Sequence, residues 1–405
     1  MLIKNKLILY KKMTNIFKLF FIFCSVVIYG QWVNIGLASK TVSKLSTNET
    51  LGIIYAVADE QLYKTNDFGQ NWILKSINNH QIFEVCVDKV TGKVYLGTNN
   101  GIYRSDDNGE NFLPINNGFP SSPIFPSIKK IIIKNDDIVI GTNAGIYKSS
   151  LDSINWTNVN NNLPLGEIKG LDWLNGNFYV ALPSGIYKST LNNNWETMSS
   201  LNVNGLAVQG NDLFLVKLGC SDFIYKSSDY GQTWSNISPN YSFCNALTVA
   251  NKNNELLIGF YYGSAMSSTN NGMNWSSYNI TPWTTILNFE KLNNFVLAGT
   301  EYYSHIANSG GVYYKFNSSL GLNEVNTANE KIFVYPNPSR NFVYIDNKNN
   351  EDEIIRIYNI SGQLVNSFNS RDSKIMIDIR NLKEGAYIIK LEGKNGFRVQ
   401  KFIKN

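Results

Sequence analysis

The sequence predicts an all-β protein, a seven-bladed β-propeller followed by a small immunoglobulin-like β-sandwich. A unit of about 40 residues recurs along most of the chain, and the C-terminal part contains short strand-like segments of another kind. The 405 residues include 23 Tyr, 22 Phe, 8 Trp and 30 Gly, a composition that favours strands and turns. Because 43% of the residues are hydrophobic and 17% are charged, disorder is excluded for most of the chain.

The repeat follows the pattern Ile-Tyr-Lys-Ser-x-Asp-x-Gly-x-x-Trp. Its tyrosine position recurs at intervals of 38 to 47 residues. The seven equivalent residues are Tyr63, Tyr103, Tyr147, Tyr187, Tyr225, Met266 and Tyr313. A period near 40 residues indicates four short strands per unit, which is the size of a propeller blade. We therefore expect residues 31–316 to form the propeller.

A tight turn in the repeat has residues with structural roles. We expect the carboxylates of Asp67, Asp107 and Asp229 to accept backbone N–H bonds across the turn. Glycines with positive φ are expected at Gly69, Gly109, Gly231 and Gly272. Tryptophans that pack the outer strand between sheets are expected at Trp72, Trp156, Trp195, Trp234 and Trp275. The turn resembles the Asp box of bacterial neuraminidase (BNR) repeats, sortilin, xyloglucanases and photosystem II assembly factors, which implies a propeller and no particular chemistry.

The last repeat lacks both the Asp box and an outer strand with a tryptophan. The segment Gln31–Ile35 is similar to the outer strands that begin at Trp156 and Trp234. We therefore expect this N-terminal segment, with Trp32, to complete the seventh blade and close the ring, which leaves no open sheet edge.

The N-terminus resembles a secretory signal peptide over residues 1–30. Five lysines and no acidic residue lie in this segment, an apolar run covers residues 19–29, and Gly30 suits the cleavage site. An uncleaved membrane anchor is the alternative, although the apolar run is short for a bilayer. Translation from Met1 or from Met13 leaves a signal of this kind.

Three cysteines remain in the exported chain. Cys220 and Cys244 are expected on the same face of adjacent blades, so they are the predicted disulfide, and Cys86 is expected to be free and buried. The chain has two histidines and no Cys-x-x-Cys motif, so we expect neither a metal site nor a cofactor.

The C-terminal segment is expected to be a separate domain over residues 332–405, behind a linker over residues 317–331. It resembles the C-terminal sorting domain of type IX secretion in Bacteroidota. The matching segments are Tyr335–Ser339, Ile357–Val365, Leu382–Lys390 and Lys401–Lys404. The resemblance implies export to the cell surface or the medium, with the secretion machinery as a partner.

The charge balance argues against nucleic-acid binding, and the number of arginines argues against a sialidase. Residues 31–330 contain 18 basic and 23 acidic residues, so nucleic-acid binding is not expected. The same stretch has one arginine, Arg104, whereas sialidases hold the substrate carboxylate with three arginines. No catalytic residue is assigned.

We expect a monomer that binds a glycan or a surface protein through aromatic residues on one face of the ring. The expected ligand-binding residues are Tyr261, Tyr262, Trp283, Tyr302, Tyr303, Asp222 and Glu301. Phe119, Phe125 and Tyr241 are placed on the same face. The alternative is a xyloglucanase-like glycoside hydrolase, for which the candidate carboxylates are Asp59, Glu60, Asp222 and Glu301.

Overall fold

A computed structural model describes most of the chain after the N-terminal segment. The described residues are 32–75, 77, 80–120, 125–190, 193–239, 244–252, 255–280, 283–293, 295–306, 309–316, 334–336, 339–346, 352–359, 363–393 and 396–404. The predicted signal peptide, the predicted linker and Tyr241 lie outside these residues.

Seven four-stranded antiparallel sheets form the first domain, and they follow the sequence repeats one for one. In each blade the strands are named from the innermost to the outermost. Blade one consists of β2 (Val42–Asn48), β3 (Ile53–Ala58), β4 (Gln61–Thr65) and β5 (Ile73–Lys75), and blade two consists of β6 (Ile82–Val87), β7 (Val94–Thr98), β8 (Gly101–Ser105) and β9 (Leu113–Pro114). Blade three consists of β10 (Ile128–Lys134), β11 (Asp137–Thr142), β12 (Gly145–Ser150) and β13 (Thr157–Asn158), and blade four consists of β14 (Gly170–Leu174), β15 (Asn177–Leu182), β16 (Gly185–Ser189) and β17 (Trp195–Ser199). Blade five consists of β18 (Gly205–Gln209), β19 (Asp212–Val216), β20 (Ile224–Ser227) and β21 (Ser235–Asn236). Blade six consists of β22 (Ala246–Lys252), β23 (Glu255–Phe260), β24 (Ser264–Ser268) and β25 (Ser276–Asn279). Blade seven consists of β26 (Ile286–Leu292), β27 (Phe295–Thr300), β28 (Gly311–Phe316) and β1 (Val33–Asn34).

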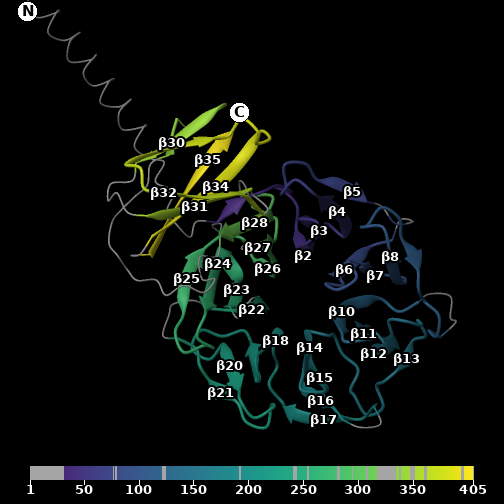
Figure 1. Cartoon of the computed structure of the whole chain (residues 1–405). Coiled ribbons are helices and arrows are strands. Elements are labelled where there is room, and N and C mark those ends of the chain that lie inside the picture. Colours follow the sequence, from purple (N-terminus) through teal and green to yellow (C-terminus); the bar gives the residue numbers. More distant parts are fainter. Residues whose placement is uncertain are drawn as a thin grey trace, which may run out of the picture.

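The sheets stand in a ring around a central axis, with the inner strands toward the axis (Figure 1). The N-terminal strand closes this ring as predicted. Val33 pairs with Tyr314 and Asn34 pairs with Tyr313, so β1 is the outer strand of blade seven. The pairing of the first strand with the last blade joins the two ends of the propeller without an open edge.

The turns that resemble the Asp box, here called box turns, share one hydrogen-bond geometry. In Asp67, Asp107 and Asp229, Oδ1 accepts the backbone N–H four residues later at 2.9 Å and a hydroxyl two residues earlier at 2.7 Å. The hydroxyl and backbone N–H donors of Thr233, with the Ser227 hydroxyl, lower the pKa of Asp229 to about 2. The four predicted glycines have positive φ values of 80° to 92°, so each box turn needs a left-handed residue. The box is therefore structural.

Tryptophans after the box hold neighbouring blades together. The indole N–H groups of Trp72, Trp156 and Trp195 donate at 2.7–2.9 Å to main-chain carbonyls at the outer strand of the preceding blade, those of Ile35, Ile115 and Val159. Trp234 and Trp275 are half-buried and pack against the clusters between blades four and five and between blades five and six. A second link was not predicted: the hydroxyl of Tyr55 donates to the Asn108 carbonyl at 2.9 Å, and Tyr179 reaches Tyr230 in the same way at 3.0 Å.

The second domain has two facing sheets. One has the order β29-β30-β33, with β29 (Val334–Tyr335), β30 (Phe342–Asp346) and β33 (Lys374–Asp378). The other has the order β32-β31-β34-β35, with β31 (Glu353–Asn359), β32 (Leu364–Ser370), β34 (Gly385–Gly393) and β35 (Gly396–Lys404). Buried residues from both sheets, among them Val343, Ile355, Ile377, Ile389 and Phe402, form one core, as in a β-sandwich. The sequence predicts β31 to β35, as strands at Ile354–Tyr358, Gln363–Phe368, Ile375–Ile379, Ala386–Leu391 and Arg398–Ile403, and it does not predict β29 and β30.

No helix among the described residues is long and apolar enough to cross a membrane. The one helical element that bears on function is the short 3-10 turn η2 (Tyr261–Gly263), which joins β23 to β24 in blade six.

Candidate functional site

The two faces of the ring differ. One face, here called the box face, has the box turns between the third and fourth strands of the sheets. The opposite face, here called the loop face, has the loops between the second and third strands and the connections between consecutive blades. Antiparallel strands fix this division, because successive turns of a blade alternate between the two ends of its strands.

An aromatic cluster lies on the loop face where blades six and seven meet. Tyr261 and Tyr262 come from η2, and Trp283 comes from the connection between β25 and β26. The ring centroids of Tyr262 and Trp283 are 6.0 Å apart in an edge-to-face arrangement, and those of Tyr261 and Tyr262 are 6.2 Å apart. The structure therefore brings three of the predicted ligand-binding residues together.

Exposure and backbone geometry distinguish two members of this cluster. The side chains of Tyr262 and Trp283 are 66% and 65% exposed, among the most exposed aromatic side chains described. Both residues also have left-handed backbones, with φ of 66° and 61°. A bulky residue pays a conformational cost in this region, and such strain is often found at ligand-binding sites.

Tyr303 is held next to the cluster by a short polar network. Its hydroxyl donates to the Glu301 carboxylate at 2.6 Å and is 2.8 Å from the Thr285 hydroxyl. Burial, and then the hydrogen bond to Glu301, raises the pKa of Tyr303. Its ring lies 5.9 Å from that of His305. Tyr303 and Glu301 thus have fixed positions, and we expect no ionisation of the tyrosine near neutral pH.

The remaining predicted residues lie apart from this cluster. Asp222 is in the β19–β20 loop of blade five, where Lys217 pairs with it at 2.6 Å and lowers its pKa. Tyr302 is half-buried, and its backbone N–H donates to the Thr41 hydroxyl. Phe119 lies on the loop face as predicted, in the connection between β9 and β10, but it is 8% exposed and stacks on Trp156 with ring centroids 5.4 Å apart, so it is not available to a ligand. Phe125 packs against Phe119 and is half-buried for the same reason.

The four carboxylates of the hydrolase alternative come from three blades. Asp59 and Glu60 follow β3 in blade one, whereas Asp222 is in blade five and Glu301 follows β27 in blade seven. Each has a local partner: Lys40 for Asp59, Gln81 for Glu60, Lys217 for Asp222 and Tyr303 for Glu301. A carboxyl group that a lysine keeps ionised, such as Asp222, is a poor proton donor. Among the described residues, no cluster of His, Cys, Asp and Glu side chains could hold a metal ion.

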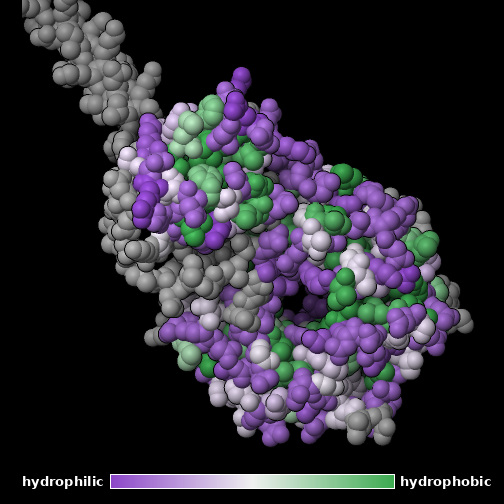
Figure 2. All heavy atoms as spheres, in the orientation of Figure 1, coloured by the Kyte–Doolittle hydropathy of each residue, from purple (hydrophilic) through white to green (hydrophobic). Residues whose placement is uncertain are grey.

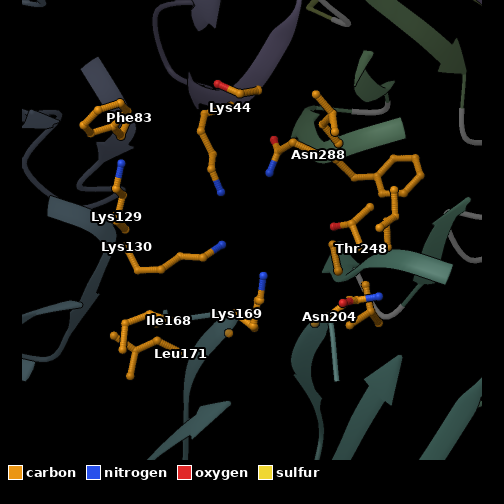
Figure 3. A pocket seen from close by; sticks show the side chains of 18 of the residues that line it. Lys44, Phe83, Lys129, Lys130, Ile168, Lys169, Leu171, Asn204, Thr248 and Asn288 are labelled. Carbon is orange, nitrogen blue, oxygen red and sulfur yellow. The ribbon is translucent and has the colours of Figure 1, made fainter. Parts of the chain in front are cut away.

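The central channel is lined by lysines that the sequence pattern does not predict. It encloses about 1080 Å³, and residues of all seven inner strands or the positions just before them line it. Its opening is the hollow at the centre of the ring in Figure 2. Five lysines and three acidic residues are among its lining, although the propeller as a whole has more acidic than basic residues. Lys44, Lys130 and Lys169 point their ammonium groups toward the same space (Figure 3).

β-Bulges place these side chains. Five of the seven inner strands have a register shift at their second residue, at Ser43, Phe83, Lys129, Leu247 and Leu287. A bulge re-aims the side chains around it, and here residues on both sides of the shift line the channel. Strict alternation along a strand does not predict this, which is why the lysines were not recognised in the sequence.

The predicted cysteine pair is a disulfide. Cys220, in the β19–β20 loop, is bonded to Cys244, just before β22, and their Cα atoms are 4.1 Å apart. The bond joins blades five and six on the loop face. Cys86 is free as expected, but it is half-buried rather than buried, and it packs at the edge of the hydrophobic cluster between blades two and three.

Removal of the disulfide is expected to lower the free energy of unfolding by roughly 3 kcal/mol, because it closes a loop of 24 residues in the unfolded chain. Denaturant unfolding of a Cys220→Ser, Cys244→Ser variant measures this loss. A reductant should destabilise the native chain and leave the variant unchanged. Equal stability of the two proteins would contradict a structural role for the bond.

Comparison with known proteins gives two results. Residues 333–405 match the family described as "Secretion system C-terminal sorting domain". No curated protein matches the sequence.

Three solved structures share the fold of the first domain at low sequence identity. YCF48 bound to D1 peptide is 15% identical with a TM-score of 0.56, covering 73% of this chain and 98% of that one. YCF48 from Cyanidioschyzon merolae is 13% identical with a TM-score of 0.55, covering 71% of this chain and 99% of that one. The GH74 enzyme of Niastella koreensis is 16% identical with a TM-score of 0.51, covering 78% of this chain and 59% of that one. The chain is therefore a β-propeller with a C-terminal sorting domain, which directs export by type IX secretion to the cell surface or the extracellular space.

Proposed function

We propose that this protein is an exported, non-catalytic binding protein that holds a glycan on the aromatic cluster of the loop face. The observation that carries the proposal is the pair Tyr262 and Trp283, which are adjacent, about two-thirds exposed and both in left-handed backbone. Strained backbone conformations cluster at ligand-binding sites, and adjacent exposed aromatic side chains are typical of binding surfaces.

The chemistry of the cluster suits a sugar chain. Aromatic rings offer apolar faces for the C–H faces of a sugar ring, and tyrosine hydroxyls add polar ends. The Tyr303 hydroxyl, which interacts electrostatically with Tyr261, and the Glu301 carboxylate to which it donates add hydrogen-bonding groups near the rings. A rigid ring of sheets holds both loops, so little conformational freedom is lost on binding.

A double variant tests the proposal directly. Tyr262→Ala, Trp283→Ala should weaken binding to a recognised polysaccharide at least about tenfold, since truncation of aromatic anchors commonly has this effect. Gel retardation in polysaccharide-containing gels measures the change. Tyr230→Ala is the matched control, because Tyr230 is also an exposed tyrosine with positive φ but lies on the box face. If the double variant still binds the polysaccharide, the aromatic cluster is not the binding site. If the native protein binds only proteins and no polysaccharide, the ligand is a protein and not a glycan.

The alternative function is hydrolysis of a polysaccharide. The observation that favours it is the similarity in fold to the GH74 enzyme, and its candidate residues are Asp59, Glu60, Asp222 and Glu301. If it holds, Glu301→Gln or Asp222→Asn should abolish the release of reducing ends and leave binding intact.

Export depends, in this proposal, on the second domain. Deletion of residues 331–405 should keep the propeller off the cell surface and out of the medium, because the sorting domain is the part that the secretion machinery reads. Immunoblots of cell fractions and medium measure this. Undiminished surface or secreted protein after the deletion would contradict it.

A further inference from the structure

Six polar side chains line the channel at its loop-face end. Lys44, Lys130, Thr248 and Asn288 follow the bulges of their inner strands, and Lys169 and Asn204 directly precede β14 and β18. Because inner strands begin at the loop face, these residues lie near the same level of the channel. Figure 3 shows the three lysines on one side of the cavity and Asn204, Thr248 and Asn288 on the other.

The lysines are not fully compensated by protein carboxylates. Lys169 pairs with Glu167 at 2.7 Å, and Lys44 is 3.5 Å from Glu84. Lys130 forms no ion pair with any described residue, and the charge of Lys44 acts on it more strongly than that of Glu84, the carboxylate that pairs with Lys44. Asp59 and Glu60 also line the mouth, but Asp59 pairs with Lys40 and Glu60 accepts a hydrogen bond from Gln81.

This arrangement is unfavourable for the protein alone. Two lysines side by side in a half-buried cavity repel each other, and an unpaired lysine is seldom placed in such surroundings. The positive charge of Lys44, and then burial, lowers the pKa of Lys130, although the Glu84 carboxylate acts in the opposite direction. An anion between the ammonium groups would remove this repulsion.

We propose that the loop-face end of the channel binds a tetrahedral oxyanion, a sulfate or phosphate group, between Lys44, Lys130 and Lys169. Lysine ammonium groups are compact charges with freely rotating donors, and they bind phosphate-like anions as point charges, so three of them around one space suit an anion with several acceptor oxygens. Asn288 contributes a further donor: its Oδ1 accepts the Leu45 N–H at 3.0 Å, so its amide NH₂ remains for the ligand. This site is separate from the aromatic cluster and goes beyond the proposed function.

Titration calorimetry of the exported protein with sodium sulfate and sodium phosphate, at constant ionic strength against chloride, tests the site. Saturable binding is expected, and Lys130→Met should weaken it about tenfold or more, because it removes one charge-assisted hydrogen bond. Lys44→Met should do the same. Lys148→Met is the matched control from blade three, since Lys148 pairs with Asp137 on β11 and does not line the channel.

Melting temperatures show that the variants fold. In chloride, Lys130→Met should melt no lower than the native protein, because the two lysines repel each other in the ligand-free protein. Sulfate should raise the melting temperature of the native protein alone.

A sulfated oligosaccharide and its desulfated counterpart identify the source of the anionic group. Binding of the inorganic ions indicates a free anion, and binding of only the sulfated sugar indicates an anion carried by a larger ligand. No binding in any arm, or binding unchanged by Lys130→Met and Lys44→Met, overturns the proposal.

Discussion

Trp32→Ala is expected to lower the free energy of unfolding of the propeller by about 3–5 kcal/mol, as is usual for the truncation of a buried tryptophan. Trp32 is 4% exposed and packs between blades six and seven, with its ring 6.3 Å from that of Phe289. Its indole N–H has no acceptor among the described residues, so the loss is one of packing. Denaturant unfolding followed by tryptophan fluorescence measures it.

The same strand supplies a control for this prediction. Val33 is 46% exposed on β1, so Val33→Ala should change stability by less than about 0.5 kcal/mol. A chain that begins at Ser39 should lose β1 altogether and expose the edge of β28, which favours aggregation. Native-like melting of either Trp32→Ala or the shortened chain would contradict ring closure by the N-terminal strand.

Gly69→Ala is expected to lower the free energy of unfolding by about 2–5 kcal/mol. Gly69 has φ of +86°, and a Cβ atom there would lie 2.1 Å from the Ile35 carbonyl oxygen. The substitution therefore combines backbone strain with a clash against the segment that follows β1, which cannot move without breaking the closure. Thermal unfolding of the variant measures the effect.

Gly176→Ala separates the two causes. Gly176 has φ of +85°, but a Cβ atom there would have no neighbour within 4 Å. The Gly176→Ala variant should therefore lose only the free energy that backbone strain costs, about 1 kcal/mol of the free energy of unfolding. Equal losses at Gly69 and Gly176 would show that the contact with Ile35 contributes nothing.

The repeat, the closure and the disulfide could be predicted because each depends on local patterns. The Asp-x-Gly-x-x-Trp spacing fixes the turn and the outer strand wherever it occurs, and once the period is known the position of Cys220 and Cys244 on one face follows. The similarity of Gln31–Ile35 to later outer strands predicted a contact between residues about 280 positions apart, such as Val33 with Tyr314.

The channel lysines could not be predicted in the same way. Lys129 and Lys130 are adjacent in sequence, so alternation would point one of them away from the channel, yet the bulge lets both line it. The burial of Phe119 could not be predicted either: the sequence places it correctly on a loop, but only the folded chain shows Trp156 stacked against it. The exposure of Tyr262 and Trp283 likewise depends on the backbone of two loops, which no repeat describes.

The most direct test of the central claim is to measure retention and hydrolysis together, with the native protein and a panel of surface and extracellular polysaccharides. Our account predicts that at least one polysaccharide is retained, that retention is lost in Tyr262→Ala, Trp283→Ala, and that no reducing ends appear over the same period. Release of reducing ends from a retained polysaccharide, abolished by Glu301→Gln or Asp222→Asn, would contradict it and establish a hydrolase.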